Sequence, residues 1–199
     1  RTCEGNYLFL DLHHIVADGT SLAIIMNDIN RAYSGEKLEP ETYTSYDLAL
    51  DNRDALASDS YRNAEDYYRS VFEKAGGSIS FYPDKSGATP AAELYRRESM
   101  EISVQAVKDF CKKHGITENV FFISAFGIML GKYNFKKDAV FTTIYHGRND
   151  SRLSETVGML VKTLPVYCNF AGSTEDCLAE IQRQLINSMN NDIYPFAQI

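Results

Sequence analysis

Hydrophobic and polar positions follow two different periods in the first part of the chain. Residues 6–12 are mostly apolar, rich in strand-forming types and free of Gly and Pro, which predicts a buried strand. A helical repeat follows, with Thr20 or Ser21 as the expected N-cap and Gly35 as the expected stop. The apolar positions of this helix are Leu22, Ile25, Met26, Ile29 and Tyr33.

Strand-like and helix-like segments continue to alternate along the rest of the sequence, which is typical of an α/β fold. Capping residues and apolar spacing set the expected bounds. The expected elements are a helix over 60–74 ended by Gly76 and Gly77, a strand over 93–102, a helix from its cap Ser103 through Lys113 closed by Gly115, a helix capped by Thr117 with an apolar face over 120–130, a strand over 139–145, an extended stretch over 157–170, and a helix opened by Ser173 that runs to Asn190.

The most loop-like part of the chain contains Pro83, Gly87 and Pro90 among polar neighbours. Such clusters mark connections rather than helices or strands. We therefore expect a linker over 77–90. It would separate residues 1–76, which form the end of an N-terminal lobe, from residues 91–199, which form part of a C-terminal lobe.

Composition indicates a globular protein and excludes two classes of partner. The 199 residues are 44% hydrophobic, enough to bury a sizeable core. A net charge of -7 with no clustered basic run argues against nucleic-acid binding. No apolar run is long enough to span a membrane. The four cysteines lack CxxC spacing and are too few for a disulfide scaffold, which predicts reduced thiols and a cytoplasmic location.

The strongest candidate for chemistry is the run from His13 to Gly19. An imidazole accepts and returns a proton near neutral pH, and His13 and His14 stand side by side after the expected strand. Neighbouring strand side chains point to opposite faces, so one histidine should face a cleft while the other packs inward. Asp18, four residues after His14, is placed to orient an imidazole, and Gly19 turns the chain into the helix.

This run resembles the HHxxxDG signature of condensation domains in nonribosomal peptide synthetases. These domains belong to the CoA-dependent acyltransferase superfamily, which includes chloramphenicol acetyltransferase. Three later stretches also resemble family motifs, in the same order: 147–149 with 157–165, then 191–196, and more weakly 43–49. The resemblance implies a chloramphenicol acetyltransferase-like fold, with a mixed sheet flanked by helices in two lobes. It also implies that this chain is an internal piece, because the His-bearing strand lies near the end of the family's first lobe.

Two positions depart from the family pattern. Lys162 stands where the family usually has Asn, and Leu160 where it often has Phe. Any substrate contact that the usual Asn makes is therefore open for this chain.

The resemblance implies a transferase that forms an amide bond. His14 corresponds to the histidine that assists an acceptor amine as it attacks a donor acyl thioester, either as a base or as a positioning group. Both substrates arrive on the 4'-phosphopantetheine arms of carrier proteins, with adenylation domains as neighbours and no cofactor bound directly. Asp18 is expected to be held by Arg148, which fixes the loop. His13 is expected to be packed and hydrogen-bonded. Gly19 either adopts a backbone conformation that only glycine tolerates and brings its N–H close to substrate, or forms a tight turn.

Functions other than condensation fit the sequence less well. A metal site is disfavoured because adjacent strand residues diverge and no second ligand pair completes a shell. No nucleophile elbow, phosphate-binding loop or dinucleotide fingerprint is present. An epimerisation domain shares the histidine motif but often has an aromatic where this chain has Leu22; a cyclisation domain fits less well. A non-catalytic recruitment platform also remains open. His114 and His146 carry weaker signals, and the isolated piece is expected to be inactive.

Overall fold

The computed structural model describes residues 5–73, 75, 97–99 and 101–199. These residues divide into two compact units, one comprising Arg1–Arg62 and Ile144–Lys162, the other Asn63–Thr143 and Thr163–Ile199. The expected linker over 77–90 and most of the strand expected over 93–102 lie outside the described residues. The described part of that strand, residues 97–99 and 101–102, has no regular secondary structure. The division into lobes at 1–76 and 91–199 stays a prediction.

The strand predicted over residues 6–12 is wrong in this structure. The segment has no regular secondary structure, and the side chains of Tyr7, Leu8 and Phe9 are exposed. Strand backbone needs a partner for its N–H and C=O groups, and among the described residues only Gly5 takes part in an isolated bridge. Apolar composition alone therefore did not produce a strand, because no strand in the described part of the chain pairs with this segment.

The first unit contains two helices, α1 (Gly19–Tyr33) and α2 (Ser45–Ala55). The N-cap of α1 is Asp18 and not Thr20 or Ser21, because the Asp18 carboxylate accepts the Ser21 N–H and starts the helix earlier than predicted. A capping box between Thr44 and Asp47 starts α2. None of the residues of α2 is buried, so no apolar stripe signalled it in the sequence.

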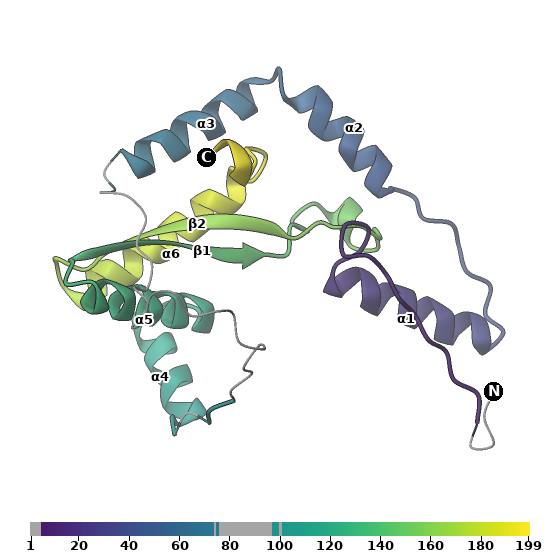
Figure 1. Cartoon of the computed structure of the whole chain (residues 1–199), viewed down its shortest axis with the longest axis horizontal. Coiled ribbons are helices and arrows are strands. Elements are labelled where there is room, and N and C mark those ends of the chain that lie inside the picture. Colours follow the sequence, from purple (N-terminus) through teal and green to yellow (C-terminus); the bar gives the residue numbers. More distant parts are fainter. Residues whose placement is uncertain (1–4, 74, 76–96, 100) are drawn as a thin grey trace, which may run out of the picture. The chain divides into compact units, whose positions relative to one another are not determined.

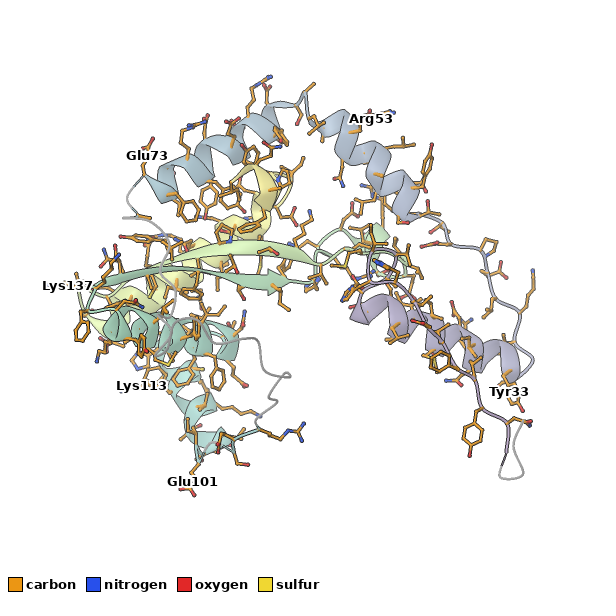
Figure 2. The ribbon with its side chains drawn as sticks, viewed as in Figure 1. Tyr33, Arg53, Glu73, Glu101, Lys113 and Lys137 are labelled. Atoms are coloured by element: carbon orange, nitrogen blue, oxygen red, sulfur yellow. The ribbon has the colours of Figure 1, made fainter. Side chains whose placement is uncertain are left out.

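Helices α3 (Asp59–Phe72), α4 (Val104–His114), α5 (Glu118–Tyr133) and α6 (Thr174–Asn190) follow the predicted pattern. The caps Ser103, Thr117 and Ser173 are confirmed, since each side chain accepts a backbone N–H in the first turn of its helix. Gly115 ends α4 in the left-handed conformation, with φ 62°. Figure 2 shows Lys113 in the last turn of α4, where the helix dipole favours a cation.

A two-stranded sheet carries the core of the second unit. Strands β1 (Asp138–Tyr145) and β2 (Lys162–Asn169) are hydrogen-bonded neighbours that run in opposite directions (Figure 1). One face of β2 packs against α5 and α6. The buried cluster there consists of Val120, Ile123, Val166, Cys168, Cys177, Ile181 and Leu185. Two short 3-10 helices, Ser151–Leu153 and Phe196–Gln198, complete the elements found in the described residues.

No helix in the described part of the chain is long and apolar enough to cross a membrane. The apolar run over 120–130 lies within α5. It contributes Val120 and Ile123 to the core cluster. Its nearly continuous apolar character predicted burial on most sides, which is wrong here, because Phe122, Phe126 and Met129 are exposed.

Candidate active site at the histidine turn

His14 lies in a turn formed by residues 14–16, and His13 directly precedes this turn. The Val16 N–H donates to the His13 carbonyl oxygen at 3.0 Å, and the Ile15 N–H donates to His13 Nδ1 at 3.1 Å. Both histidine side chains are exposed. The prediction that His13 packs inward is wrong here, because it assumed a strand, whereas a turn places His13 over its own backbone. His14 forms no hydrogen bond to any residue that the structure describes, so its ring is open to reactants.

Asp18 ends the turn region and is almost fully buried. Its Oδ1 accepts the Ser21 N–H at 2.8 Å and Arg148 Nη2 at 3.1 Å, while Oδ2 accepts the Leu160 N–H at 3.1 Å. Burial on its own would raise the pKa of this carboxyl, but hydrogen bonds from Ser21, Leu160 and Arg148 outweigh it and lower the pKa to about 2. Asp18 is therefore ionised at neutral pH and fully engaged in structure.

Arg148, which follows the end of β1, joins three chain segments. Its Nη1 donates to the carbonyl oxygens of Leu153 at 2.6 Å and Thr156 at 2.8 Å, and its Nη2 lies 3.1 Å from both Asp18 Oδ1 and Ser21 Oγ. The ion pair is sequestered from water, with exposed side-chain fractions of 6% for Arg148 and 0% for Asp18. Figure 1 shows the loop after β1 lying beside the start of α1, where these contacts form. The structure thus brings together the two residues that the sequence motifs paired.

Ser21, which the sequence offered only as a possible helix cap, also contacts Asp18 and Gly158. Its fully buried Oγ lies 2.9 Å from Asp18 Oδ1 and 2.8 Å from the Gly158 carbonyl oxygen, and it accepts the Gly158 N–H at 3.0 Å. The Asp18 N–H also donates to the Gly158 carbonyl at 3.2 Å. The spacing of Asp18 and Ser21, three residues apart, is the sequence signal that an N-cap offers.

These contacts explain why the extended stretch predicted over 157–170 is a strand only from Lys162 onward. In the preceding residues, backbone N–H groups donate to side chains instead of a neighbouring strand. Val157 donates to Glu41 Oε1 at 2.8 Å, Gly158 to Ser21, and Leu160 to Asp18. The stretch is therefore bound to the histidine-bearing segment.

Gly147 and Gly19 behave differently from each other. Gly147 has φ 68°, and a Cβ there would lie 1.9 Å from the Leu160 carbonyl oxygen, so only glycine fits. The Cγ of Lys162, at the start of β2, would lie 3.5 Å from the same Cβ. At Gly19 a Cβ would meet nothing within 4 Å, and its φ is outside the left-handed range. The expectation that Gly19 adopts a glycine-only conformation is wrong, whereas its approach to substrate stays a prediction.

The expected orienting hydrogen bond between Asp18 and His14 is not formed in the described part of the chain, where the donors to the Asp18 carboxylate come from Ser21, Leu160 and Arg148. The remaining histidines have local roles. His146 Nδ1 accepts the Arg148 N–H at 3.0 Å. The His114 ring lies 4.3 Å from the Phe110 ring, centroid to centroid, at the C-terminal turn of α4. Among the described residues, no three His, Cys, Asp or Glu side chains form a group that could hold a metal ion.

An open cavity of about 310 Å³ lies next to the histidine turn. Its wall is both polar and apolar and comes from the end of the turn, from α2 and from the stretch that Asp18 binds. The lining residues are Ile15, Val16, Ser45, Leu48, Ala49, Asn52, Gly158, Met159 and Leu160. Ile15 and Val16, the two residues that follow His14, therefore line this cavity.

Solved structures show the same fold as this chain. The first condensation domain of the calcium-dependent antibiotic synthetase, solved with a substrate analogue, superposes with a TM-score of 0.73 at 17% identity, covering 94% of this chain and 43% of that one. The epimerization domain from the third module of tyrocidine synthetase B superposes with a TM-score of 0.72 at 18% identity, covering 92% and 46%. The expected α/β fold of the chloramphenicol acetyltransferase type is confirmed.

The family follows from the sequence match. The condensation domain family model matches residues 1–199, so the chain belongs to the condensation domain family. A relative, the hybrid PKS-NRPS synthetase pydA of an Acremonium species, is 28% identical over 199 residues, which are 96% of this chain and 5% of that protein. The chain thus spans a small part of the curated relative and less than half of the solved domains.

Proposed function

We propose that this chain carries the histidine-bearing part of a condensation site, in which an acceptor amine attacks a donor thioester and an amide bond forms. The observation that carries the proposal is the contrast between His14 and Asp18. The His14 imidazole is exposed and engages no other described residue, while Asp18, four residues later, is buried and held by Ser21, Leu160 and Arg148. A free imidazole on a firmly anchored loop suits a group that must meet a substrate.

His14 acts on the attacking amine. The amine must lose a proton as its nitrogen bonds to the acyl carbon and the thiolate leaves. An imidazole at this place can accept that proton or hold the amine in line. A positioned general base typically contributes about 10²–10⁴-fold to rate, and holding two reactants together contributes about 7–11 kcal/mol. Either role requires that the loop stay fixed, which the buried pair of Asp18 and Arg148 ensures.

The substrates in this proposal are acyl or aminoacyl groups on 4'-phosphopantetheine arms of carrier proteins. The flexible arm brings each group to the histidine, so the chain itself needs no bound cofactor. Family membership and the synthetase relative support this assignment. Carrier and adenylation domains are then the neighbours of this domain, and the location is cytoplasmic. Because the rest of the N-terminal lobe would supply half of the cleft, the 199-residue piece by itself is inactive.

The experiment uses a synthetase that contains this chain, with its carrier domains loaded with a defined donor and acceptor. His14→Ala should lower the single-turnover rate of dipeptidyl product by about 10²-fold or more. His114→Ala is the matched control, because it removes a histidine from the end of α4, and it should condense at the parental rate. Undiminished amide formation by His14→Ala would refute the assigned role. Amide formation by the purified 199-residue piece would refute its dependence on the rest of the N-terminal lobe.

Epimerisation is the alternative function, and the same experiment distinguishes it from condensation. The solved epimerization domain has the same fold, so architecture does not discriminate between the two activities. Chiral analysis of the released product does. Inverted configuration without a new amide bond, lost in His14→Ala, would replace condensation with epimerisation. Carrier binding with neither product would identify a recruitment platform.

A further inference from the structure

Two cysteines of the second unit lie in contact inside its core. Cys168 is near the end of β2 and Cys177 is in α6, and their Sγ atoms are 3.6 Å apart. The exposed fractions are 0% for Cys168 and 3% for Cys177, and both thiols are free. A disulfide bond is about 2.05 Å long. The two sulfur atoms, now 3.6 Å apart, therefore need to approach each other by about 1.5 Å.

The surrounding core holds Cys168 in this position. Helix α5 packs so closely that a Cβ at Gly127 would lie 2.9 Å from both Cβ and Sγ of Cys168. Val166 on β2 and Ile181 on α6 belong to the same buried cluster. The two cysteines are nine positions apart in the sequence. Neither sulfur therefore has to cross the structure to reach the other.

The two thiols also differ in chemistry. Cys177 is in the first turns of α6, where the N-terminal end of a helix favours negative charge. The pKa of Cys177 lies below its ordinary value because its sulfur accepts a hydrogen bond from Cys168. The same hydrogen bond, together with burial, raises the pKa of the Cys168 thiol. Cys177 is thus the thiol that ionises first.

We propose that Cys168 and Cys177 are an oxidation site that forms an intramolecular disulfide in the presence of a peroxide. The Cys177 thiol releases its proton, the thiolate attacks one peroxide oxygen, and the O–O bond breaks to give a sulfenic acid and a hydroxide, which takes up the released proton and leaves as water. The Cys168 sulfur then attacks the sulfenic sulfur, the S–O bond breaks, and a second water leaves. In total, two thiols lose two electrons and two protons while one peroxide is reduced to two waters.

The residues just before Cys177, at the start of α6, face solvent. Thr174, Glu175 and Asp176 are all exposed, and Cys177 follows them directly. A small peroxide needs only a local opening of this first turn, and such openings are less costly than global unfolding. The product would tie the end of β2 covalently to α6.

The test treats the reduced 199-residue chain with hydrogen peroxide, blocks remaining thiols by alkylation, and maps peptides by mass spectrometry without reduction. The expected result is a peptide pair linked through Cys168 and Cys177, lighter by two hydrogens than the two thiol peptides and released by dithiothreitol. Cys111→Ser is the matched control, since it removes another buried free cysteine, and it should form the same link. Cys168→Ser should not form it.

The opposing outcomes are equally specific. Full alkylation of both cysteines after peroxide treatment, or a link from either one to Cys111 or Cys3, would overturn the proposal. Conversion of Cys177 to sulfinic acid in the parental chain, with Cys168 still alkylated, would also overturn it. The mapping on the parental chain decides the matter even if Cys168→Ser does not fold.

Discussion

Gly147 presses directly against the carbonyl oxygen of Leu160, with a φ of 68° and only 1.9 Å between that oxygen and the position a Cβ would take. The contact fixes the path of the chain just before Arg148. Gly147→Ala should therefore lower the free energy of unfolding by more than the roughly 1–2 kcal/mol that the left-handed conformation costs a non-glycine residue.

Gly115→Ala is the matched control for this prediction. Gly115 has a similar φ of 62°, but a Cβ there meets nothing within 4 Å. Its substitution should cost only the conformational penalty. Urea unfolding of the two variants measures the difference. Equal losses of stability would contradict the close contact at Leu160.

A second prediction concerns the buried ion pair. Asp18→Asn or Arg148→Met should each lower the free energy of unfolding by about 3–5 kcal/mol, because either change leaves a buried group without its partner. The double variant should lose less than the sum of the two, since it leaves no uncompensated charge. A double-mutant cycle in urea measures this coupling. Arg69→Ala, which breaks an exposed pair with Glu65, should change stability by less than about 1 kcal/mol. Strict additivity at Asp18 and Arg148 would contradict the prediction.

The pKa of Asp18 gives the pair a pH dependence. The folded pKa is about 2, below the ordinary 3.8, so the unfolded chain binds the proton more readily. The stabilisation is fully present above about pH 4 and is lost as the pH falls towards 2. The shift corresponds to about 2 kcal/mol. The stability difference between the parental chain and Asp18→Asn, measured by urea unfolding, should shrink between pH 5 and pH 2.5. A constant difference over that range would show that the carboxyl is not the titrating group.

Ser21 offers a fourth test. Ser21→Ala leaves the buried Gly158 N–H without its acceptor and removes one contact of Asp18. An unsatisfied buried group costs about 1–3 kcal/mol. Ser70→Ala is the control, because Ser70 is exposed and only donates to the Tyr67 carbonyl. Thermal unfolding should show a clear decrease in Tm for Ser21→Ala and almost none for Ser70→Ala.

The sequence predicted best those elements that local chemistry determines. The caps Ser103, Thr117 and Ser173 and the stop at Gly115 were read correctly, because a cap needs only residues within one turn. The strand over 6–12 failed because pairing requires a distant partner. Helix α2 was missed because its signal is a capping box without a buried face.

In the candidate site, too, some contacts could be predicted from the sequence and others could not. The contact between Asp18 and Arg148 was expected from motif resemblance, although 130 positions separate the two residues. Leu153 and Thr156 could not be identified from side-chain type, because they accept hydrogen bonds from Arg148 through their backbone carbonyls. The exposed position of His13 could not be foreseen once a strand was assumed.

Arg148 donates hydrogen bonds to the main-chain oxygens of Leu153 and Thr156. This choice of acceptor affects which positions of the loop can vary in sequence. Every residue type carries the same backbone carbonyl. The exposed positions Ser154 and Glu155, between the two accepting residues, can therefore be substituted without loss of the hydrogen bonds to the Arg148 guanidinium. Mutational tolerance should thus be broad at these two sites and narrow at Arg148, so the surface of this loop can change in sequence while the contacts that Arg148 makes with it are kept.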